Sequence, residues 1–168
     1  MHQEQLAAIA RLGEAFERQG IDYWLFGGWA VDFHAGRITR PHADVDVAAW
    51  LADADRIHSS LEAMGWQQVP EPDADGYAAY ELEHVRVEVA FLARDDDGTV
   101  YTPLTDGRGL WPTHSFGDDF AELEGVRART ISLQALIADK SAAHGDDAVA
   151  AKDRLDVTVL ERPRDASA

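Results

Sequence analysis

The 168-residue sequence contains no cysteine, and this absence removes several classes of structure at once. Disulfide bonds cannot form, and zinc or iron–sulfur sites that depend on thiolate ligands are excluded. The compartment stays open on this ground alone, and the cytoplasm is the simplest expectation. A chain of this length needs no cross-links, because one domain of its size buries roughly two thirds of the surface that the unfolded chain exposes. We therefore expect a single domain over residues 1–168.

Long apolar runs and basic residues are also scarce. The N-terminal stretch MHQEQLAAIARLGEAFERQG lacks the apolar core of a signal peptide, and no later segment approaches the roughly 20 apolar residues of a membrane span. The chain contains only 15 lysines and arginines but 31 aspartates and glutamates, which gives a net charge of −16. Because affinity for a nucleic-acid backbone comes largely from lysine and arginine, a polymer of this kind is a poor partner. The composition predicts a soluble protein that binds neither membranes nor nucleic acids.

The hydrophobic pattern predicts an α/β or α+β domain with a mixed sheet flanked by helices. Apolar residues recur at helical spacing from Leu6 to Phe16, and Gly20 stands where that helix would end. Strands are expected over 21–26, 44–50, 77–83 and 85–93, with a last hairpin near 122–130. Further helices are expected over 29–35, 52–65, 133–144 and 149–160, so the C-terminal part is helical from about residue 132. Prolines and glycines in residues 101–119 predict a long loop there.

The stretch FGGWAVDFHAGRITRPHADVDVAAW, from Phe26 to Trp50, combines two features that suit phosphate and metal binding. Gly27 and Gly28 follow an apolar strand, where they let the backbone turn sharply and approach a phosphate at the start of a helix. Further on, Asp44 and Asp46 alternate with valines, which places both carboxylates on one face of a strand. Like charges at neighbouring positions repel each other, and a hard cation such as Mg²⁺ offsets that repulsion.

A second strand repeats this alternation. In VRVEVAF the valines form one face, and Glu88 lies on the other face together with Arg86. If this strand lies beside that of Asp44 and Asp46, three carboxylates converge. Two would bind metal, and the third would be a further ligand or the general base for an attacking hydroxyl. The alternative is that Glu88 faces solvent and is paired with a neighbour such as Arg86.

These motifs resemble the antibiotic nucleotidyltransferases of the polymerase-β-like superfamily. The run GGWAVDFHAGRITRPHADVDV is especially similar to the small aminoglycoside and lincosamide nucleotidyltransferases, and the similarity is close over residues 21–50. It is looser around Glu88, Lys140 and KDRLD. The resemblance implies a polymerase-β-like nucleotidyltransferase fold. It also implies transfer of a nucleoside monophosphate from an NTP, with ATP expected, to a hydroxyl of a small molecule, with Mg²⁺ and release of pyrophosphate.

By this resemblance, individual residues receive roles. Asp44 and Asp46 would be the catalytic, metal-binding aspartates and Glu88 the third carboxylate, and Gly27, Gly28 and Lys140 would hold the triphosphate. The sequence departs from the family pattern in two places: some relatives have Asp where Glu88 stands, and an arginine expected after Lys140 is absent.

Two arginines are also candidates to bind the NTP, because they precede Asp44 in the sequence. Arg37 and Arg40 flank that loop, and a guanidinium group can bind phosphate oxygens in a bidentate manner. Surface ion pairs are the alternative for both arginines.

Other residues allow alternative sites. A zinc site of His42, Asp44 and Asp46 is conceivable, although three ligands spaced two apart on one strand seldom close on a tetrahedral ion. Trp24 and Trp29 are expected in the core. Trp111, in the predicted loop, is a candidate to stack on a base or sugar.

The acceptor is expected to be a cationic, aminoglycoside-type antibiotic, because the acidic excess attracts ammonium groups. Other functions stay open: a lincosamide nucleotidyltransferase, a minimal nucleotidyltransferase that modifies a partner protein of the toxin–antitoxin type, or a degenerate relative that only binds nucleotide. An enzyme that extends RNA is disfavoured by the negative charge. A homodimer is also kept open.

Overall fold

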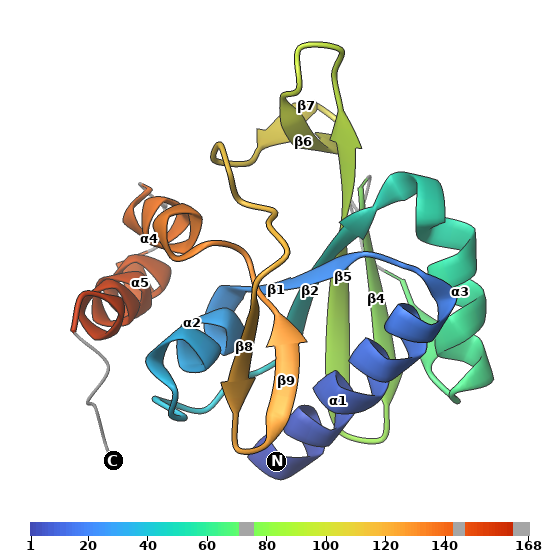
Figure 1. Ribbon diagram of the computed structural model, residues 1–168, viewed down its shortest axis with the longest axis horizontal. Coiled ribbons are helices and arrows are strands. Elements are labelled where there is room, and N and C mark those ends of the chain that lie inside the picture. The colour runs from blue at the N-terminus through green and yellow to red at the C-terminus, as the bar shows by residue number, and fades with distance from the viewer. Residues whose placement is uncertain (71–75, 143–146, 163–168) are drawn as a thin grey trace.

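A mixed seven-stranded sheet organises the part of the chain that the computed structural model describes, residues 1–70, 76–142 and 147–162 (Figure 1). The path across the sheet is β1 (Tyr23–Phe26), β2 (Val45–Trp50), β5 (Val85–Arg94), β4 (Tyr77–Leu82) and β3 (Gln67–Val69). β2 and β5 are parallel, whereas the other neighbours on this path are antiparallel. The predicted mixed sheet is therefore confirmed.

Helices form at the predicted places. They are α1 (His2–Gln19), α2 (Gly27–Ala35), α3 (Ala54–Ala63), α4 (Leu133–Ser141) and α5 (Asp147–Leu160), with a short 3₁₀ turn, η1 (Leu51–Asp53), before α3. α1 ends at Gly20, which adopts a left-handed φ of 65°. Ser132 caps α4 by accepting a hydrogen bond from the backbone N–H of Ala135 at 3.1 Å. None of the described helices combines the length and the apolar character that crossing a lipid bilayer requires.

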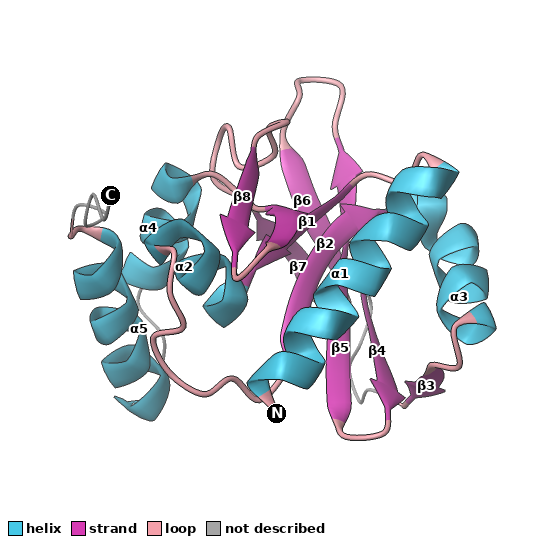
Figure 2. Ribbon diagram, turned by 60° about the horizontal axis from the view of Figure 1, so that its bottom comes forward, coloured by secondary structure: helices cyan, strands magenta, loops and turns pink. Residues whose placement is uncertain are grey.

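The C-terminal helices gather around α2, beyond the β1 edge of the sheet. Figures 1 and 2 both show α2, α4 and α5 side by side, with α1 and α3 on the other side of the molecule. The end of the helix predicted over 133–144 lies partly outside the described residues, since α4 ends at Ser141.

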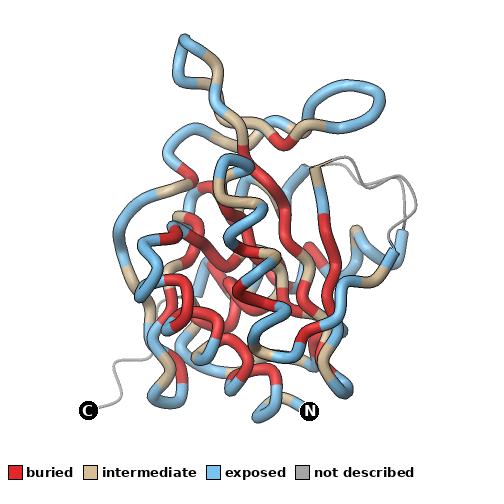
Figure 3. Tube along the Cα trace, turned by 90° about the vertical axis from the view of Figure 1, so that its right-hand side faces the viewer, coloured by how far each residue is buried: buried red, intermediate tan, exposed pale blue. Residues whose placement is uncertain are grey.

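Side chains on one side of the central strands form an apolar core. We call this side the valine face; its members include Val45, Val47, Val87 and Val89. α1 and α3 cover it: the ring of Phe16 packs on Tyr23 with centroids 5.8 Å apart, and His58 lies 3.3 Å from the hydroxyl of Tyr80. In Figure 3 the buried residues gather in this interior.

The opposite side, which we call the carboxylate face, carries acidic residues at one end and aromatic residues further along. Its acidic members are Asp46 and Glu88, which are register partners across β2 and β5. Its aromatic members are Trp24, Phe26 and Trp50. Residues 111–117 cover the aromatic part: Trp111 packs on Phe26 with ring centroids 5.2 Å apart, and the indole N–H of Trp24 donates to the carbonyl of Gly117 at 2.7 Å. The acidic end stays accessible.

The prediction of a long loop over 101–119 is wrong for the first half of that range. Residues there form a hairpin of β6 (Val100–Leu104) and β7 (Gly107–Leu110), which extends the end of β5. Pro103 is tolerated because β6 pairs with β5 only through Tyr101 and Val100, so the proline has a strand on one side only. β3 was not predicted, since its three residues are too few and too polar to give a strand signal.

The last two described strands form a separate hairpin. β8 (Phe120–Leu123) and β9 (Val126–Arg129) form it, as predicted near 122–130. The chain then runs beside β1, where Thr130 bridges Leu25 in parallel and the N–H of Ile131 donates to the carbonyl of Leu25 at 2.9 Å.

Candidate active site

Three carboxylates meet at the acidic end of the carboxylate face. One oxygen from each of Asp44, Asp46 and Glu88 lies within 4.8 Å of the other two, and no other such group of metal-ligating side chains occurs among the described residues. The parallel register of β2 and β5 sets Asp46 directly opposite Glu88. Asp44 was expected inside the strand, but β2 begins at Val45, so Asp44 immediately precedes the ladder.

The crowding of these carboxylates changes their acidity. Burial, Asp44 and Glu88, in that order, raise the pKa of Asp46 from 3.8 to about 7. Burial and the charge of Glu88 also raise the pKa of Asp44. A site that holds three carboxylates together at this electrostatic cost is suited to a cation. Its donors are all oxygens, which hard divalent cations such as Mg²⁺ prefer.

The two glycines allow the start of α2 to lie against this cluster. Gly27 is the first residue of α2 and has a φ of 64°; a Cβ at this position would lie 2.0 Å from the Asp46 carboxylate. A Cβ on Gly28 would lie 2.3 Å from Nδ1 of His42. Any larger residue would therefore separate the helix from the loop and strand that carry the aspartates. The N-terminus of a helix attracts anions, so it is a suitable place for phosphate beside a metal.

Glu88 belongs to the cluster and is also ion-paired. Nε of Arg86 donates to Glu88 Oε1 at 2.8 Å, and an Arg86 Nη donates to Glu81 Oε1 at 3.2 Å. Both interpretations of Glu88 drawn from the sequence thus describe part of its surroundings.

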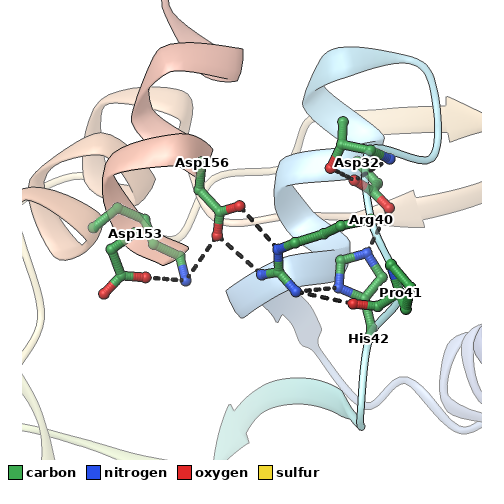
Figure 4. Close-up of polar contacts among 8 residues, drawn as sticks. Asp32, Arg40, Pro41, His42, Asp153 and Asp156 are labelled. Carbon is green, nitrogen blue, oxygen red and sulfur yellow. Dashed lines mark hydrogen bonds and ion pairs between the residues drawn. The ribbon is translucent and has the colours of Figure 1, made fainter. Parts of the chain in front are cut away.

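Two of the three cations expected to bind phosphate are paired with carboxylates of α5 (Figure 4). Nε and Nη2 of Arg40 donate to the two oxygens of Asp156 at 3.1 and 3.0 Å. Nζ of Lys140 donates to Asp153 at 2.9 Å and lies 3.4 Å from Asp156. Lys140 is buried, and its charge acts to lower the pKa of Asp46, so it remains within electrostatic reach of the cluster. Arg37 is exposed.

His42 does not join the aspartates. Its Nε2 lies 2.5 Å from Asp32 Oδ2, and its Nδ1 lies 3.1 Å from an Nη of Arg40 (Figure 4). With both ring nitrogens engaged in this way, the zinc site of His42, Asp44 and Asp46 is not formed. Asp32 is fully buried and also accepts hydrogen bonds from the backbone N–H and the hydroxyl of Thr39.

The sequence did not reveal Asp32, Asp156 or Tyr77 as neighbours of the site. A single acid within the apolar run WAVDF was a usable signal for Asp32, and Asp156 ends the stretch KDRLD, over which the resemblance to the family is loose. Tyr77 pairs with Ala90, which places it on the carboxylate face, where it is partly exposed. Burial, Asp139 and then the acidic cluster raise the pKa of Tyr77.

The side chain of Trp111 contacts neighbouring residues of the chain through both its indole N–H and its ring. Its indole N–H donates to the hydroxyl of Thr102 at 2.9 Å, and its ring packs on Phe26 and Phe116. It borders a hollow of about 390 Å³ between residues 94–100 and 111–116 that includes none of the three carboxylates. Trp24 and Trp29 lie in the core, as predicted.

Comparison with known proteins identifies related sequences. A sequence model of the aminoglycoside-2''-adenylyltransferase family matches residues 8–160. A 2''-aminoglycoside nucleotidyltransferase of Escherichia coli is 29% identical over 93 residues, which are 55% of this chain and 52% of that protein. A lincosamide resistance protein of Staphylococcus haemolyticus is 33% identical over 54 residues, 32% of this chain and 34% of that protein. The match therefore spans about half the length of the first of these relatives.

Solved structures show the same fold. The crystal structure of ANT(2'')-Ia in complex with adenylyl-2''-tobramycin superposes with a TM-score of 0.74 at 21% identity, over 94% of this chain and 87% of that one. Lincomycin-bound LnuA, a lincosamide antibiotic adenylyltransferase, gives a TM-score of 0.68 at 21% identity, over 88% and 90% of the two chains.

Proposed function

The chain belongs to the aminoglycoside-2''-adenylyltransferase family, and from this premise we propose that it transfers a nucleoside monophosphate from an NTP to a hydroxyl of a small antibiotic. The observation that carries the proposal is the cluster of Asp44, Asp46 and Glu88, with its oxygens within 4.8 Å of one another. In this reaction the acceptor oxygen bonds to the α-phosphorus, the bond to the pyrophosphate oxygen breaks, and the hydroxyl proton leaves to a base.

The same three carboxylates would hold the divalent cation, for which we propose Mg²⁺. Burial raises the pKa of Asp46, and repulsion from Asp44 and Glu88 raises it further; a cation at this place would relieve that repulsion. When bound, Mg²⁺ would stabilise the negative charge that develops on the phosphate oxygens.

The chain contributes the remaining parts of the site. The N-terminus of α2 at Gly27 offers backbone N–H groups to the triphosphate, for which we propose ATP. Glu88, opposite Asp46, is placed to receive the hydroxyl proton or to complete the metal site. Lys140 sits close enough to affect Asp46 electrostatically, so it can compensate phosphate charge while it stays paired with Asp153.

For the acceptor we propose an aminoglycoside-type antibiotic. The family match favours this class, and the net charge of −16 attracts a polycation. A lincosamide is the second candidate, because part of the chain is similar to a lincosamide resistance protein.

Mass spectrometry tests the proposal directly. The purified protein is incubated with Mg²⁺, each of the four NTPs in turn, and tobramycin or lincomycin as acceptor. We expect one acceptor to gain the mass of a nucleoside monophosphate, and no gain with the Asp46→Asn variant. If no acceptor in a broad antibiotic panel gains this mass with any NTP, the proposed function is wrong.

A further inference from the structure

A continuous chain of hydrogen bonds leads from a buried carboxylate of α2 to Arg40 (Figure 4). Asp32 Oδ2 lies 2.5 Å from Nε2 of His42, and the other ring nitrogen, Nδ1, lies 3.1 Å from Nη1 of Arg40. The side chains of Asp32 and His42 are only 0% and 2% exposed. Because both are buried, their protein partners decide where each hydrogen lies.

Arg40 fixes the tautomer of His42. A guanidinium group has only N–H donors, so Nδ1 of His42 must accept the hydrogen bond and carries no hydrogen. The ring hydrogen is then on Nε2, which donates it to Asp32. A hydrogen on Nδ1 would instead set two donors against each other at 3.1 Å. The carboxylate on one side of the ring and the guanidinium on the other therefore favour the same tautomer.

The contacts of Arg40 leave one of its five N–H bonds without an acceptor among the described residues. Asp156 accepts from Nε and from Nη2, while the two N–H bonds of Nη1 serve His42 and the carbonyl of Pro41, which is 3.2 Å away. The remaining N–H belongs to Nη2. This atom lies against the first turn of α2, since a Cβ on Gly28 would be 2.9 Å from it.

The first turn of α2 is where the proposed triphosphate would bind. Gly27 approaches Asp46 of the acidic cluster, and the next residue, Gly28, approaches Arg40. A phosphate group held by the metal and by the N-terminus of α2 therefore comes within reach of the guanidinium, whose side chain is 23% exposed. Because hydrogen bonds hold the arginine in place beforehand, little side-chain entropy is lost when the phosphate binds.

We propose that Asp32 is a positioning residue for NTP binding: through the fixed tautomer of His42 it orients Arg40, whose remaining N–H is offered to a phosphate group. This inference rests on the proposed nucleotidyl transfer. Asp32 is itself too deeply buried to contact a substrate. Its influence therefore passes through His42 and Arg40, and it is measured as NTP affinity.

The variant Asp32→Asn tests the tautomer. The backbone N–H of Thr39, 3.0 Å from Asp32 Oδ1, can only donate, so it keeps the single amide oxygen of the asparagine. The amide nitrogen then donates to Nε2 of His42, which moves the ring hydrogen to Nδ1, against Arg40. We measure the Kd of ATP by isothermal titration with Mg²⁺ and no acceptor. This Kd should rise about tenfold, the loss expected for one displaced hydrogen bond to a charged group.

Nitrogen-15 NMR of the histidine side chains measures the tautomer directly. In the wild type, Nδ1 of His42 should carry no hydrogen, and in Asp32→Asn it should carry one. His42→Phe assigns these signals by their loss. It also removes an acceptor of Arg40 and keeps a ring beside Trp29, so the Kd of ATP should rise here too. This variant takes the place of Asp32→Asn if the asparagine variant does not fold.

Two comparisons separate positioning from a general loss of structure. Thr39→Val removes the hydroxyl that donates to Asp32 Oδ1 and leaves the contact with His42 in place. It should lower the melting temperature, while the Kd of ATP stays near that of the wild type. In the second comparison, Asp32→Asn is added to Arg40→Met. The Kd should then change little beyond the effect of Arg40→Met alone, because the residue through which Asp32 acts is gone.

The outcomes distinguish the two proposals. Three results overturn the role of Asp32 and leave the proposed function standing: a wild-type His42 with hydrogen on Nδ1, an ATP Kd that Asp32→Asn changes no more than Thr39→Val does, or effects of Asp32→Asn and Arg40→Met that add in the double variant. Failure of the wild type to bind any of the four NTPs overturns the proposed function, and the inference about Asp32 with it.

Discussion

At the scale of single residues, Asp46 determines how the metal-free site responds to pH. Its folded-state pKa is raised to about 7, whereas in the unfolded chain it ionises near 3.8. Between these values the unfolded state loses its proton first, so the contribution of Asp46 to stability falls as the pH rises from about 4 to about 7. Above that range the folded protein carries a repelling charge that a cation would neutralise.

We therefore expect Asp46→Asn to abolish transfer and yet stabilise the metal-free protein. The gain in free energy of unfolding should be on the order of 2 kcal/mol at pH 8, since each pKa unit corresponds to about 1.4 kcal/mol and solvent screens part of the shift at this half-buried group. Near pH 4 the gain should vanish. Urea unfolding with a chelator across this pH range measures it, and Asp118→Asn, in an exposed loop, is the matched control. An equal gain at every pH would contradict the prediction.

Glu88 allows a separate kinetic prediction. If it accepts the hydroxyl proton, Glu88→Gln lowers kcat by about 100-fold or more, because a general base contributes in the transition state. NTP affinity, measured by isothermal titration in the absence of acceptor, should change much less. A loss of NTP affinity with turnover preserved at saturation would show that Glu88 is a metal ligand only.

At the scale of elements, the close approach of α2 to β2 depends on Gly27. We expect Gly27→Ala to abolish transfer and to cost more stability than the roughly 1 kcal/mol of a left-handed backbone, because the new Cβ would overlap Asp46. Gly20→Ala is a suitable control: Gly20 has a similar φ of 65°, and a Cβ there meets nothing within 4 Å. Thermal melts and activity of both variants test this. Equal stability losses with activity retained would mean that the approach of α2 to Asp46 is unimportant.

The ion pair between Arg40 and Asp156 joins the loop before Asp44 to α5. Burial acts to raise the pKa of Asp156, but the hydrogen bonds and charges of Arg40 and Lys140 outweigh it and hold the pKa below 3.8. The stabilisation is therefore present above the unfolded pKa and is lost as the pH falls through the lower folded value. A double-mutant cycle with Arg40→Met and Asp156→Asn should give a coupling of about 1–2 kcal/mol at pH 7.

The same cycle should give a smaller coupling as the pH is lowered through the folded pKa of Asp156, because the carboxylate then takes up a proton. The exposed pair of Arg56 and Asp53 is the control, and its coupling should stay below about 1 kcal/mol. A coupling that does not change with pH would show that the link is not ionic.

Much of the fold could be predicted from the sequence, because the signals for these elements lie within short stretches of the chain. Alternating valines located β2 and β5, helical spacing located α1, and Ser132 marked the start of α4. Asp44, Asp46 and Glu88 could be brought together because strand alternation fixes their face and only one neighbour relation had to be assumed. The partners of Arg40 and Lys140 could not be predicted, since they depend on how α5 packs against α4 and against the loop before Asp44, which no spacing along the chain encodes. The hairpin of β6 and β7 could not be predicted, because its proline and glycines indicated a loop.

At the scale of the whole molecule, the net charge of −16 should act on the acceptor before it binds. We expect the KM of tobramycin to rise several-fold when ionic strength increases from about 0.05 M to about 0.5 M, because screening shortens the range of the attraction. Lincomycin carries a single amine, and its KM should rise much less. Steady-state kinetics over this range of salt measures both values, and a tobramycin KM that is insensitive to salt would remove the case for long-range attraction.

The alternation of valines and carboxylates on β2 and β5 also bears on how the chain avoids misfolding. Sliding either strand by one residue would turn Asp46 or Glu88 into the apolar core and expose the valines to water. Burying an unpaired carboxylate costs far more than losing a few apolar contacts, so a shifted pairing of these two strands is strongly disfavoured. Parallel pairing between distant segments is slow and open to such errors. The residues proposed for chemistry thus also select the correct strand alignment, and replacing them with apolar residues would remove this selection together with the activity.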